Sequence, residues 1–569
     1  MIGALAAAAV TALALAGFAA VAGGLWRPDA FDYAQIGREL AEGRGFSSRQ
    51  AIYALHLAFL RDHGLLFADW PNLHRFPLPS LLMAAGFRLF GTSDAVVMGT
   101  SIACQAATAG LLFAFARAAL GLAPAVACVF LVCANGVLLE TGASGLSEPP
   151  ATFCFTLAVY AVWRQRSVES VWPGLLAGAA LGFAALARTN LVFAAPLFLA
   201  ALALARRGPQ GQRDLRRGGA AAALAALAMA AVASPWWLRN AWWTGDPFFS
   251  LHSYFLIPSG AGEGADKWDL TLPWVRELHS PLAYLAEHPG AVFEKWWGHL
   301  ARLLRELPTF AGTRGVMPVA AAALLLPAGP GLRPVAWLLV SAFALNALIV
   351  SLGDFYLIKY HLHVLPGMIL LAVGVAWQQL QRLTLGGPRL RALLLACVAL
   401  ALADLVGVAQ ELRRVPLAVA RFEPAHWDAI RKETAEDAVI VSDQSYAVTW
   451  RTGRRSVRVH YDRLPDGSPV LGVLALSDAY LPIDAVHLSR EFLSDPARIA
   501  ILAQTFVRVP RFGEEFPRVR ALEGGGLLLL RPITPRIPAA GAGRASPDRP
   551  ALPPVAPPPP GAAPPGAPR

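Results

Sequence analysis

Charged residues are scarce in this sequence, and lysine is especially rare. Only 15% of the 569 residues are charged, and lysine occurs at just four positions, 267, 295, 359 and 432. A globular domain is nearer a quarter charged, whereas 56% of this chain is hydrophobic and its mean hydropathy is +0.47. The scarcity of charge excludes an ordinary water-soluble domain for most of the chain and indicates a protein that crosses a membrane several times.

The net charge of +11 does not indicate a nucleic-acid partner. It is carried mainly by arginine, in loops between apolar blocks, where membrane topology already accounts for basic residues. We therefore expect membrane lipids as partners and no nucleic acid. The richness in arginine and alanine is typical of a GC-rich bacterial genome, so we predict the bacterial cytoplasmic (inner) membrane as the location.

Cysteine is also rare, with five residues in the whole chain, and all of them fall inside apolar blocks. This placement predicts neither a disulfide framework nor a cysteine-based metal site outside the membrane. The first apolar segment lacks a basic start, and Gly23-Gly24-Leu25-Trp26 is typical of an interfacial helix end rather than a cleavage site. We expect this segment to be a retained membrane anchor.

Apolar blocks of suitable length predict a mainly α-helical, polytopic membrane bundle of about eleven spans over residues 1–410. The basic loops put the N-terminus in the cytoplasm. The first loop (26–77), the Ser144–Glu148 turn, a large loop (238–314) and the C-terminal region then face outward. The predicted spans are 3–25, 97–118, 122–140, 149–164, 172–187, 190–205, 218–237, 315–329, 334–351, 360–379 and 390–409.

Two segments are expected to lie at the membrane surface instead of crossing it. Segment 78–92 is apolar but short and contains Arg88, so it is interpreted as an interfacial or re-entrant helix. Residues 51–60 predict a second helix lying on the membrane. Within the first loop, Asp29 and Tyr33 begin a face at helical spacing that Gly43 ends.

Beyond residue 410 the hydropathy pattern changes. Residues 411–533 predict a small extracytoplasmic α/β domain, with a helix at 425–435. Residues 534–569 are rich in Pro, Ala and Gly, which predicts a disordered tail because such a composition buries too little apolar surface. The predicted strands are 438–442, 456–460, 484–488, 505–509 and 526–531.

Asp29 is the strongest candidate for chemistry, because it lies in Trp26-Arg27-Pro28-Asp29, just after the first span. A transferase acting on a lipid-linked sugar needs a carboxylate at the level of the lipid head group to activate its acceptor. An aspartate in the first turn of an interfacial helix also stabilises free backbone donors. The spacing alone leaves both roles open.

Other acidic and aromatic residues are weaker candidates. Asp32 fits a solvated helix residue as well as a substrate ligand. Tyr33 could bond a phosphate oxygen or anchor the interface. Glu148 begins a span, where a carboxylate is costly unless paired or hydrated, although it could also complement the helix dipole next to Pro149. We favour a functional role for Glu148.

Four basic residues oppose the cytoplasmic charge bias on the outer side. Each alone fits a snorkelling side chain, but four on one face favour binding of an anionic head group, and Tyr360 begins a span beside the last of them. The histidines form no metal-binding pattern, so we predict no cofactor, while the sequence leaves a divalent metal ion open. The four residues are Arg75, Arg188, Arg239 and Lys359.

Taken in order over residues 1–533, these motifs resemble the family 39 branch of the GT-C glycosyltransferases. The first-loop pattern Trp-x-Pro-Asp-x-x-x-Tyr-Ala is present from Trp26 to Ala34, and Arg75-Phe76-Pro77 and Pro235-Trp236 have counterparts. The resemblance implies a GT-C fold, Asp29 as the catalytic base, a polyprenyl-phosphate-linked sugar donor and inversion at the anomeric carbon. Many relatives have Asp-Glu where this chain has Asp29-Ala30, and the branch of lipid A aminoarabinose transferases has Glu-Lys where this chain has Pro77-Leu78.

The leading hypothesis is an integral-membrane glycosyltransferase that moves a sugar to an envelope acceptor. Asp29 would act as general base, and Glu148 would orient sugar or acceptor. Asp32, Tyr33, Arg75, Arg188, Arg239, Lys359 and Tyr360 would bind substrate. A transporter or flippase of lipid-linked sugars is the second hypothesis and predicts ionisable residues at mid-bilayer. A third is a non-catalytic scaffold that displays the C-terminal domain.

Overall fold

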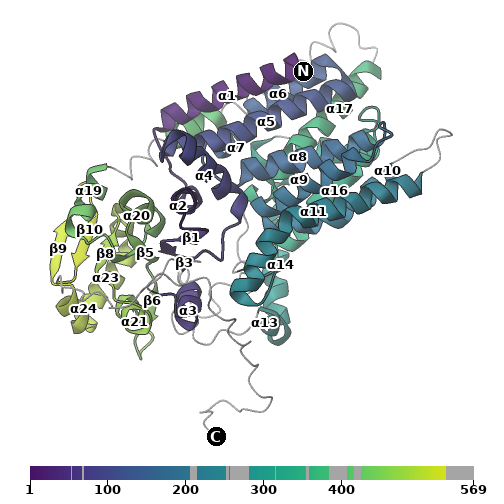
Figure 1. The fold of residues 1–569 in the computed structure, drawn as a ribbon. Helices are drawn as coiled ribbons and strands as arrows, with labels where there is room; N and C mark the ends of the chain where they lie inside the picture. The colour runs from purple at the N-terminus through teal and green to yellow at the C-terminus, as the bar shows by residue number, and fades with distance from the viewer. Residues whose placement is uncertain are drawn as a thin grey trace, which may run out of the picture.

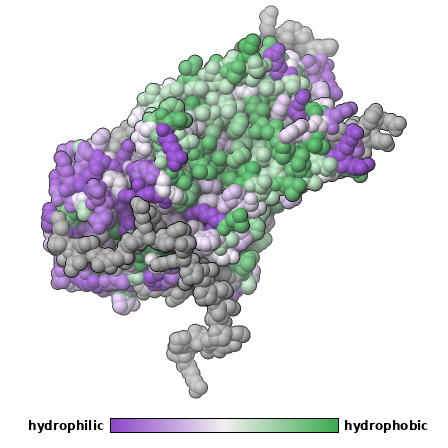
Figure 2. All heavy atoms as spheres, viewed as in Figure 1, coloured by the Kyte–Doolittle hydropathy of each residue, from purple (hydrophilic) through white to green (hydrophobic). Residues whose placement is uncertain are grey.

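The computed structural model shows a bundle of long helices joined to a smaller unit of strands and short helices (Figure 1). It describes residues 1–52, 54–66, 70–205, 214–250, 256, 281–313, 315–353, 358–382, 407–415 and 424–532. The predicted tail 534–569 and almost all of the predicted span 390–409 lie outside these residues. In one view, hydrophobic side chains cover the helical bundle, whereas hydrophilic ones gather over the smaller unit and at the far end of the bundle (Figure 2).

Five helical segments in the described part of the chain are long and apolar enough to cross a membrane. A sixth is possible if α6 (Leu122–Cys133) and α7 (Gly136–Gly142) form one span, because they meet at a bend of 70°. The predicted span 122–140 is therefore broken. The five are α1 (Ile2–Ala22), α5 (Asp94–Leu120), α11 (Leu215–Thr244), α16 (Leu332–Val350) and η5 (Ile358–Val364) continued by α17 (Leu365–Arg382).

The remaining predicted spans correspond to shorter helices, so the count of eleven stays a prediction. Predicted span 149–164 is α8 (Glu148–Gln165), and 172–187 is α9 (Trp172–Ala187). Predicted span 190–205 starts as a 3-10 helix, η1 (Thr189–Ala194), and continues as α10 (Ala195–Ala205). In 315–329 the structure has only α15 (Val316–Ala321) and η4 (Ala322–Leu324).

Helices α9 and α11 pack with their backbones unusually close. A Cβ atom added at Gly174 would come within 2.4 Å of the Ala221 carbonyl oxygen, and one at Gly178 within 2.0 Å of the Ala225 carbonyl oxygen. Small residues four apart let membrane helices approach in this way. This contact lies in the first half of α9, and Arg188 follows the last residue of that helix.

The first loop contains two helices that pack on each other, α2 (Pro28–Ala41) and α4 (Pro77–Phe90). Pro28 starts α2 because its fixed φ suits the first helical position. A Cβ at Gly37 would lie 3.0 Å from the Met83 side chain, which shows how closely the two helices pack. With 14 residues, α4 is too short to span a bilayer, and its interfacial or re-entrant placement stays a prediction.

The large loop contains several helices in the part that the structure describes. Helix α11 continues past the predicted end at residue 237 and ends at Thr244, with Pro235 inside the helix. After the undescribed part come α13 (Pro281–Glu287), α14 (Pro289–Glu306) and η3 (Leu307–Gly312).

The smaller unit, here called the C-terminal domain, contains a six-stranded sheet in the order β2-β5-β4-β8-β10-β9. Strands β2, β5, β4 and β8 run parallel, and β10 and β9 are antiparallel additions. The sheet strands from this domain are β4 (Val439–Ser442), β5 (Arg455–Arg458), β8 (Ala485–Leu488), β9 (Arg518–Ala521) and β10 (Leu527–Leu530). Beside them lie the pair β6 (Tyr461–Arg463) and β7 (Pro469–Leu471) and the helices α19 (Pro424–Glu433), α20 (Ser445–Thr452), α21 (Val473–Ala479), α22 (Arg490–Leu493), α23 (Pro496–Arg508) and α24 (Pro510–Glu515).

Four predicted strands and the predicted helix at 425–435 match elements of this domain, but the predicted strand 505–509 is wrong. Those residues complete α23. The Asp495 side chain accepts a hydrogen bond from the Ala497 N–H at the start of this helix, and Leu502, Thr505 and Phe506 pack at helical spacing. The helical period therefore prevails over the alternation within 505–509.

The first loop also contributes to the C-terminal domain. Strand β2 (Gln50–Ala51) extends its sheet by pairing with β5, while β1 (Ser47–Ser48) pairs with β3 (Trp70–Pro71). Leu57 and Leu60 of α3 (Ala54–Asp62) are fully buried in the same apolar cluster as Val457. The predicted helix at 51–60 therefore packs on the C-terminal domain instead of presenting its apolar face to the membrane.

Candidate active site

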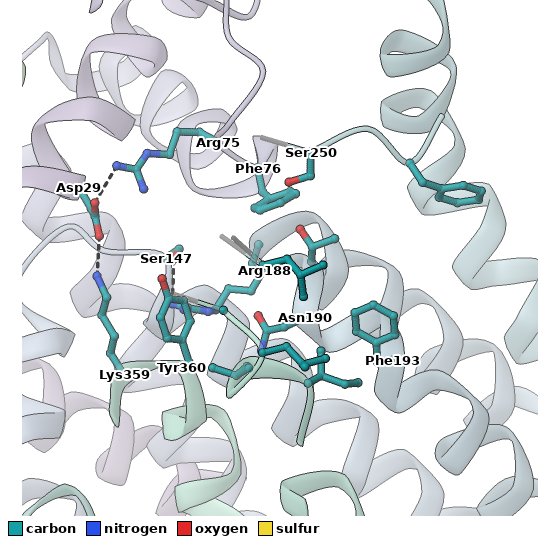
Figure 3. Close-up of a pocket in the computed structure, with 18 of the residues that line it drawn as sticks. Asp29, Arg75, Phe76, Ser147, Arg188, Asn190, Phe193, Ser250, Lys359 and Tyr360 are labelled. Atoms are coloured by element: carbon teal, nitrogen blue, oxygen red, sulfur yellow. Dashed lines mark hydrogen bonds and ion pairs between the residues drawn. The ribbon is translucent and has the colours of Figure 1, made fainter. Parts of the chain in front are cut away.

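A cavity of about 410 Å³ opens where α2, the break between α9 and η1, and η5 come together. Asp29, Arg75 and Lys359 lie on one side of it, and Arg188, Asn190 and Phe193 lie across from them (Figure 3). Phe193 is also one of several apolar residues that line the cavity, with Phe248, Leu256, Ile349, Val350 and Leu352. The cavity thus combines a charged wall with an apolar one.

Both carboxylate oxygens of Asp29 are held by cations from distant parts of the chain. Arg75 Nη2 donates to Oδ1 at 2.7 Å, and Lys359 Nζ donates to Oδ2 at 2.6 Å (Figure 3). Arg27, not Asp29, occupies the N-cap position of α2. Asp29 is therefore not the capping residue of α2, and its carboxylate pairs instead with two cations on the same side of the cavity.

Charge dominates the protonation of Asp29. Burial alone would raise the pKa of this carboxyl, but the neighbouring charges of Arg75 and Lys359 outweigh burial and hold the pKa well below its usual value. Asp29 is therefore a carboxylate at neutral pH. The two cations thus lower its basicity.

Asp32 lies one turn further along α2 and is fully buried behind this wall. Its Oδ2 accepts from Arg75 Nε at 2.6 Å and lies 2.8 Å from His74 Nε2. Arg75 also stacks 5.0 Å from the centre of the Tyr33 ring. These contacts fix the guanidinium in one orientation, so that the Nη2 side faces Asp29.

A second ion pair supports the opposite wall. Arg188 Nη1 lies 2.7 Å from Glu148 Oε1 and donates to Ser147 Oγ at 3.3 Å. The Arg188 guanidinium lies 4.5 Å from the centre of the Tyr360 ring. Glu148 is buried, with 3% of its surface exposed. A buried carboxylate is costly unless it is paired, and Arg188 supplies the opposite charge.

The structure brings six of the nine predicted site residues to the cavity wall and holds two more directly behind it. Arg239 is placed elsewhere: its Nη2 donates to the backbone carbonyls of Phe46 at 3.1 Å and Asn72 at 3.0 Å, and its guanidinium stacks on Trp236 at 4.6 Å. It secures the first loop. The lining residues are Asp29, Tyr33, Arg75, Arg188, Lys359 and Tyr360, and Asp32 and Glu148 lie behind Arg75 and Arg188.

The sequence interpretation missed four polar lining residues, Ser147, Thr189, Asn190 and Ser250. Ser147 and Thr189 are adjacent in sequence to the predicted residues Glu148 and Arg188, and Asn190 is two residues from Arg188. This proximity is the one signal that could have identified these three. Among the described residues, no group of three or more His, Cys, Asp or Glu side chains is arranged to hold a metal ion.

Residues 71–238 match the family model of dolichyl-phosphate-mannose-protein mannosyltransferases. The region that matches this family model includes Arg75, Glu148 and Arg188 but ends before Lys359. No match was found among curated protein sequences.

The fold is similar to that of ArnT from Cupriavidus metallidurans, solved bound to undecaprenyl phosphate, with a TM-score of 0.52, 13% identity and coverage of 93% of this chain and 97% of that chain. The apo structure of ArnT gives a TM-score of 0.51 at 13% identity, covering 89% and 94%. The oligosaccharyltransferase AglB from Archaeoglobus fulgidus, in complex with an inhibitory peptide and a dolichol-phosphate, gives 0.49 at 11% identity, covering 90% and 72%. The resemblance to GT-C glycosyltransferases is confirmed by the family match and by the fold.

Proposed function

We propose that this protein is an integral-membrane glycosyltransferase that moves a sugar from a polyprenyl-phosphate carrier to an acceptor in the bacterial envelope. The observation that carries the proposal is Asp29, whose two carboxylate oxygens are each held by a different cation beside an apolar wall. Cations next to apolar surface suit a phosphate attached to a lipid chain. The undecaprenyl phosphate bound by ArnT is a ligand of this class.

Phosphate binding would also activate the base. A phosphate oxygen that approaches Arg75 and Lys359 competes with Asp29 for both cations, because each already donates to that carboxylate. Once the phosphate shares them, the pKa of Asp29 rises toward the range of an ordinary carboxyl. Binding of the donor phosphate would therefore release the base from these two cations.

The transfer step then follows from the positions of these groups. Asp29 accepts the proton of the acceptor hydroxyl while the hydroxyl oxygen forms a bond to the anomeric carbon. The bond from that carbon to the phosphate oxygen breaks, and its electron pair stays on the phosphate. Arg75 and Lys359 stabilise the negative charge that develops there. Attack from the side opposite the phosphate inverts the anomeric carbon.

The two alternative functions fit the site less well. A transporter predicts ionisable groups distributed along mid-bilayer positions, whereas Asp29, Arg75, Lys359, Glu148 and Arg188 gather around one cavity. A scaffold gives no reason for a carboxylate held between two cations at a cavity wall. We place the cavity and the C-terminal domain on the outer side of the cytoplasmic membrane, following the charge bias of the loops.

A transfer assay tests the proposal. Purified protein in lipid nanodiscs is given radiolabelled polyprenyl-phosphate sugars and a cell-envelope extract, and transfer of label is measured. Wild-type protein should transfer label. Asp29→Asn should transfer it at least about 100-fold more slowly, since a positioned general base raises the rate on the order of 10²- to 10⁴-fold. Equal transfer by Asp29→Asn of unchanged melting temperature would remove Asp29 as the base.

A further inference from the structure

Three consecutive residues at the cavity wall each have a polar atom without a hydrogen-bond partner among the described residues. Arg188 Nε and Thr189 Oγ1 are buried and unpartnered, and the one hydrogen bond of Asn190 uses its Nδ2 atom. All three residues line the cavity. A buried polar atom without a partner costs on the order of 1–3 kcal/mol, so the two buried atoms, Arg188 Nε and Thr189 Oγ1, need an explanation.

The backbone explains why these three residues share the wall. Arg188 ends α9 with an extended backbone, at φ −153° and ψ 116°, and η1 begins at the next residue. The break interrupts the helix at the cavity. Figure 3 shows Arg188 and Asn190 on the side of the cavity across from Asp29 and Lys359.

A hydrogen-bond network fixes which atom Asn190 presents. The Tyr360 backbone carbonyl can only accept, so the Asn346 atom 3.1 Å from it is the amide nitrogen. The same nitrogen lies 2.8 Å from His361 Nδ1. Asn346 Oδ1 must then accept, and it does so from Asn190 Nδ2 at 2.6 Å. Asn190 therefore keeps its carbonyl oxygen, an acceptor, available to a ligand.

The three atoms together select one ligand chemistry. Arg188 Nε is a donor, the Thr189 hydroxyl is donor and acceptor, and Asn190 Oδ1 is an acceptor. An ionised phosphate diester offers only acceptors and would be repelled by Asn190 Oδ1, and an isoprenyl chain offers neither donor nor acceptor. Sugar hydroxyls both donate and accept. We propose that the Arg188–Asn190 segment is the sugar subsite of the cavity, separate from the Arg75 and Lys359 wall that holds phosphate.

This assignment deepens the proposed function and rests on it. It divides the cavity into a phosphate part on the Asp29 side and a sugar part on the Asn190 side. The sugar can belong to the donor or to a glycan acceptor, because both offer the same hydroxyl chemistry.

Binding measurements separate the two parts of the cavity. Affinity is measured in nanodiscs for undecaprenyl phosphate without a sugar and for undecaprenyl phosphate linked to mannose, glucose or galactose. Thr189→Val removes a hydroxyl at nearly constant shape, Thr189→Ser keeps it as the matched control, and Asn190→Leu removes the carbonyl acceptor. Melting temperatures identify any variant that has not folded.

Wild-type protein should bind at least one sugar-bearing lipid more tightly than the sugar-free lipid. Thr189→Val and Asn190→Leu should each weaken that binding about 3- to 10-fold, as expected for one neutral hydrogen bond, and should change sugar-free binding less than about 2-fold. Thr189→Ser should behave as wild type. If donor binding is unchanged but the KM for a glycan acceptor rises in both variants, the subsite is confirmed for the acceptor sugar.

The inference fails if both variants leave donor affinity and acceptor KM unchanged, or if they weaken sugar-free and sugar-bearing lipids equally. Failure of the proposed function gives a different result: wild-type protein would then transfer no label in the transfer assay, whichever of these lipids it binds.

Discussion

Replacing Asp29 by asparagine should make the protein bind lipid phosphate more tightly even as it loses transfer. Asp29 holds Arg75 and Lys359 through bonds of 2.7 and 2.6 Å, so an incoming phosphate must compete with it. Asparagine keeps the shape and removes the charge. The variant thus exposes two cations to the ligand and removes a like charge from its neighbourhood.

The size of the effect follows from the removed repulsion. Two unit charges about 4 Å apart interact by about 4 kcal/mol at an effective dielectric constant of about 20. Part of this is lost because the amide oxygen of asparagine still accepts a bond from one cation. With about 2 kcal/mol remaining, affinity for undecaprenyl phosphate should rise roughly 10- to 50-fold, since 1.4 kcal/mol corresponds to about tenfold.

Titration calorimetry in nanodiscs at low salt measures this affinity directly. Glu42→Gln is the matched control, because it makes the same charge change at the exposed C-terminal end of α2, where Glu42 is 44% exposed, and it should leave the affinity unchanged. If Asp29→Asn binds undecaprenyl phosphate as weakly as wild type or more weakly, the phosphate does not displace Asp29 from Arg75 and Lys359, and the proposed release of the base is refuted.

Three further predictions concern the framework of the molecule. Gly178→Ala should lower the melting temperature sharply because its Cβ would lie 2.0 Å from the Ala225 carbonyl oxygen. The control Gly219→Ala, whose Cβ would have no atom within 4 Å, should leave the melting temperature unchanged or raise it. Equal melting temperatures of the two variants would contradict the close packing of α9 on α11. Arg239→Met should cost about 1–3 kcal/mol of stability by leaving the carbonyls of Phe46 and Asn72 without this donor, with little change in affinity for lipid phosphate; the reverse result would return Arg239 to the ligand site. Burial raises the pKa of Asp443 to about 6, so the folded chain holds a proton that the unfolded chain releases near pH 4. The free energy of unfolding should therefore fall as pH rises from about 4 to about 6. Asp443→Asn should flatten the dependence of melting temperature on pH in this range.

The sequence allowed us to predict which types of residue line the candidate cavity, but not which of those residues form ion pairs with each other. Asp29 was identifiable because its position after the first apolar block sets its depth at the membrane surface. Nothing local says that Lys359, 330 residues away, supplies its partner. Arg239 was predicted as a site residue but bonds backbone carbonyls and does not line the cavity. A basic residue on the outer side has the same sequence signal whether it binds an anion or backbone carbonyls.

The fold was predictable where one period dominates a segment. Helix α2 and four strands of the C-terminal domain follow the expected patterns. The strand predicted at 505–509 failed because Thr505 to Val509 alternate over five residues while also continuing the helical spacing from Leu502. The helix-start signal Asp495-Pro496, ten residues upstream, would have decided the matter. Strand β2 has two residues, too few for any periodicity.

That two-residue strand has a consequence for how the protein is made. Gln50 and Ala51 pair with Ser456 and Val457, about 400 positions later in synthesis. The segment leading to Arg75 therefore emerges from the ribosome long before its partner exists, and it reaches its final arrangement only after nearly the whole polypeptide has been produced. A product shortened before residue 455 would retain Asp29, Arg75 and Lys359 yet leave the connection between the first two of them without its sheet neighbour.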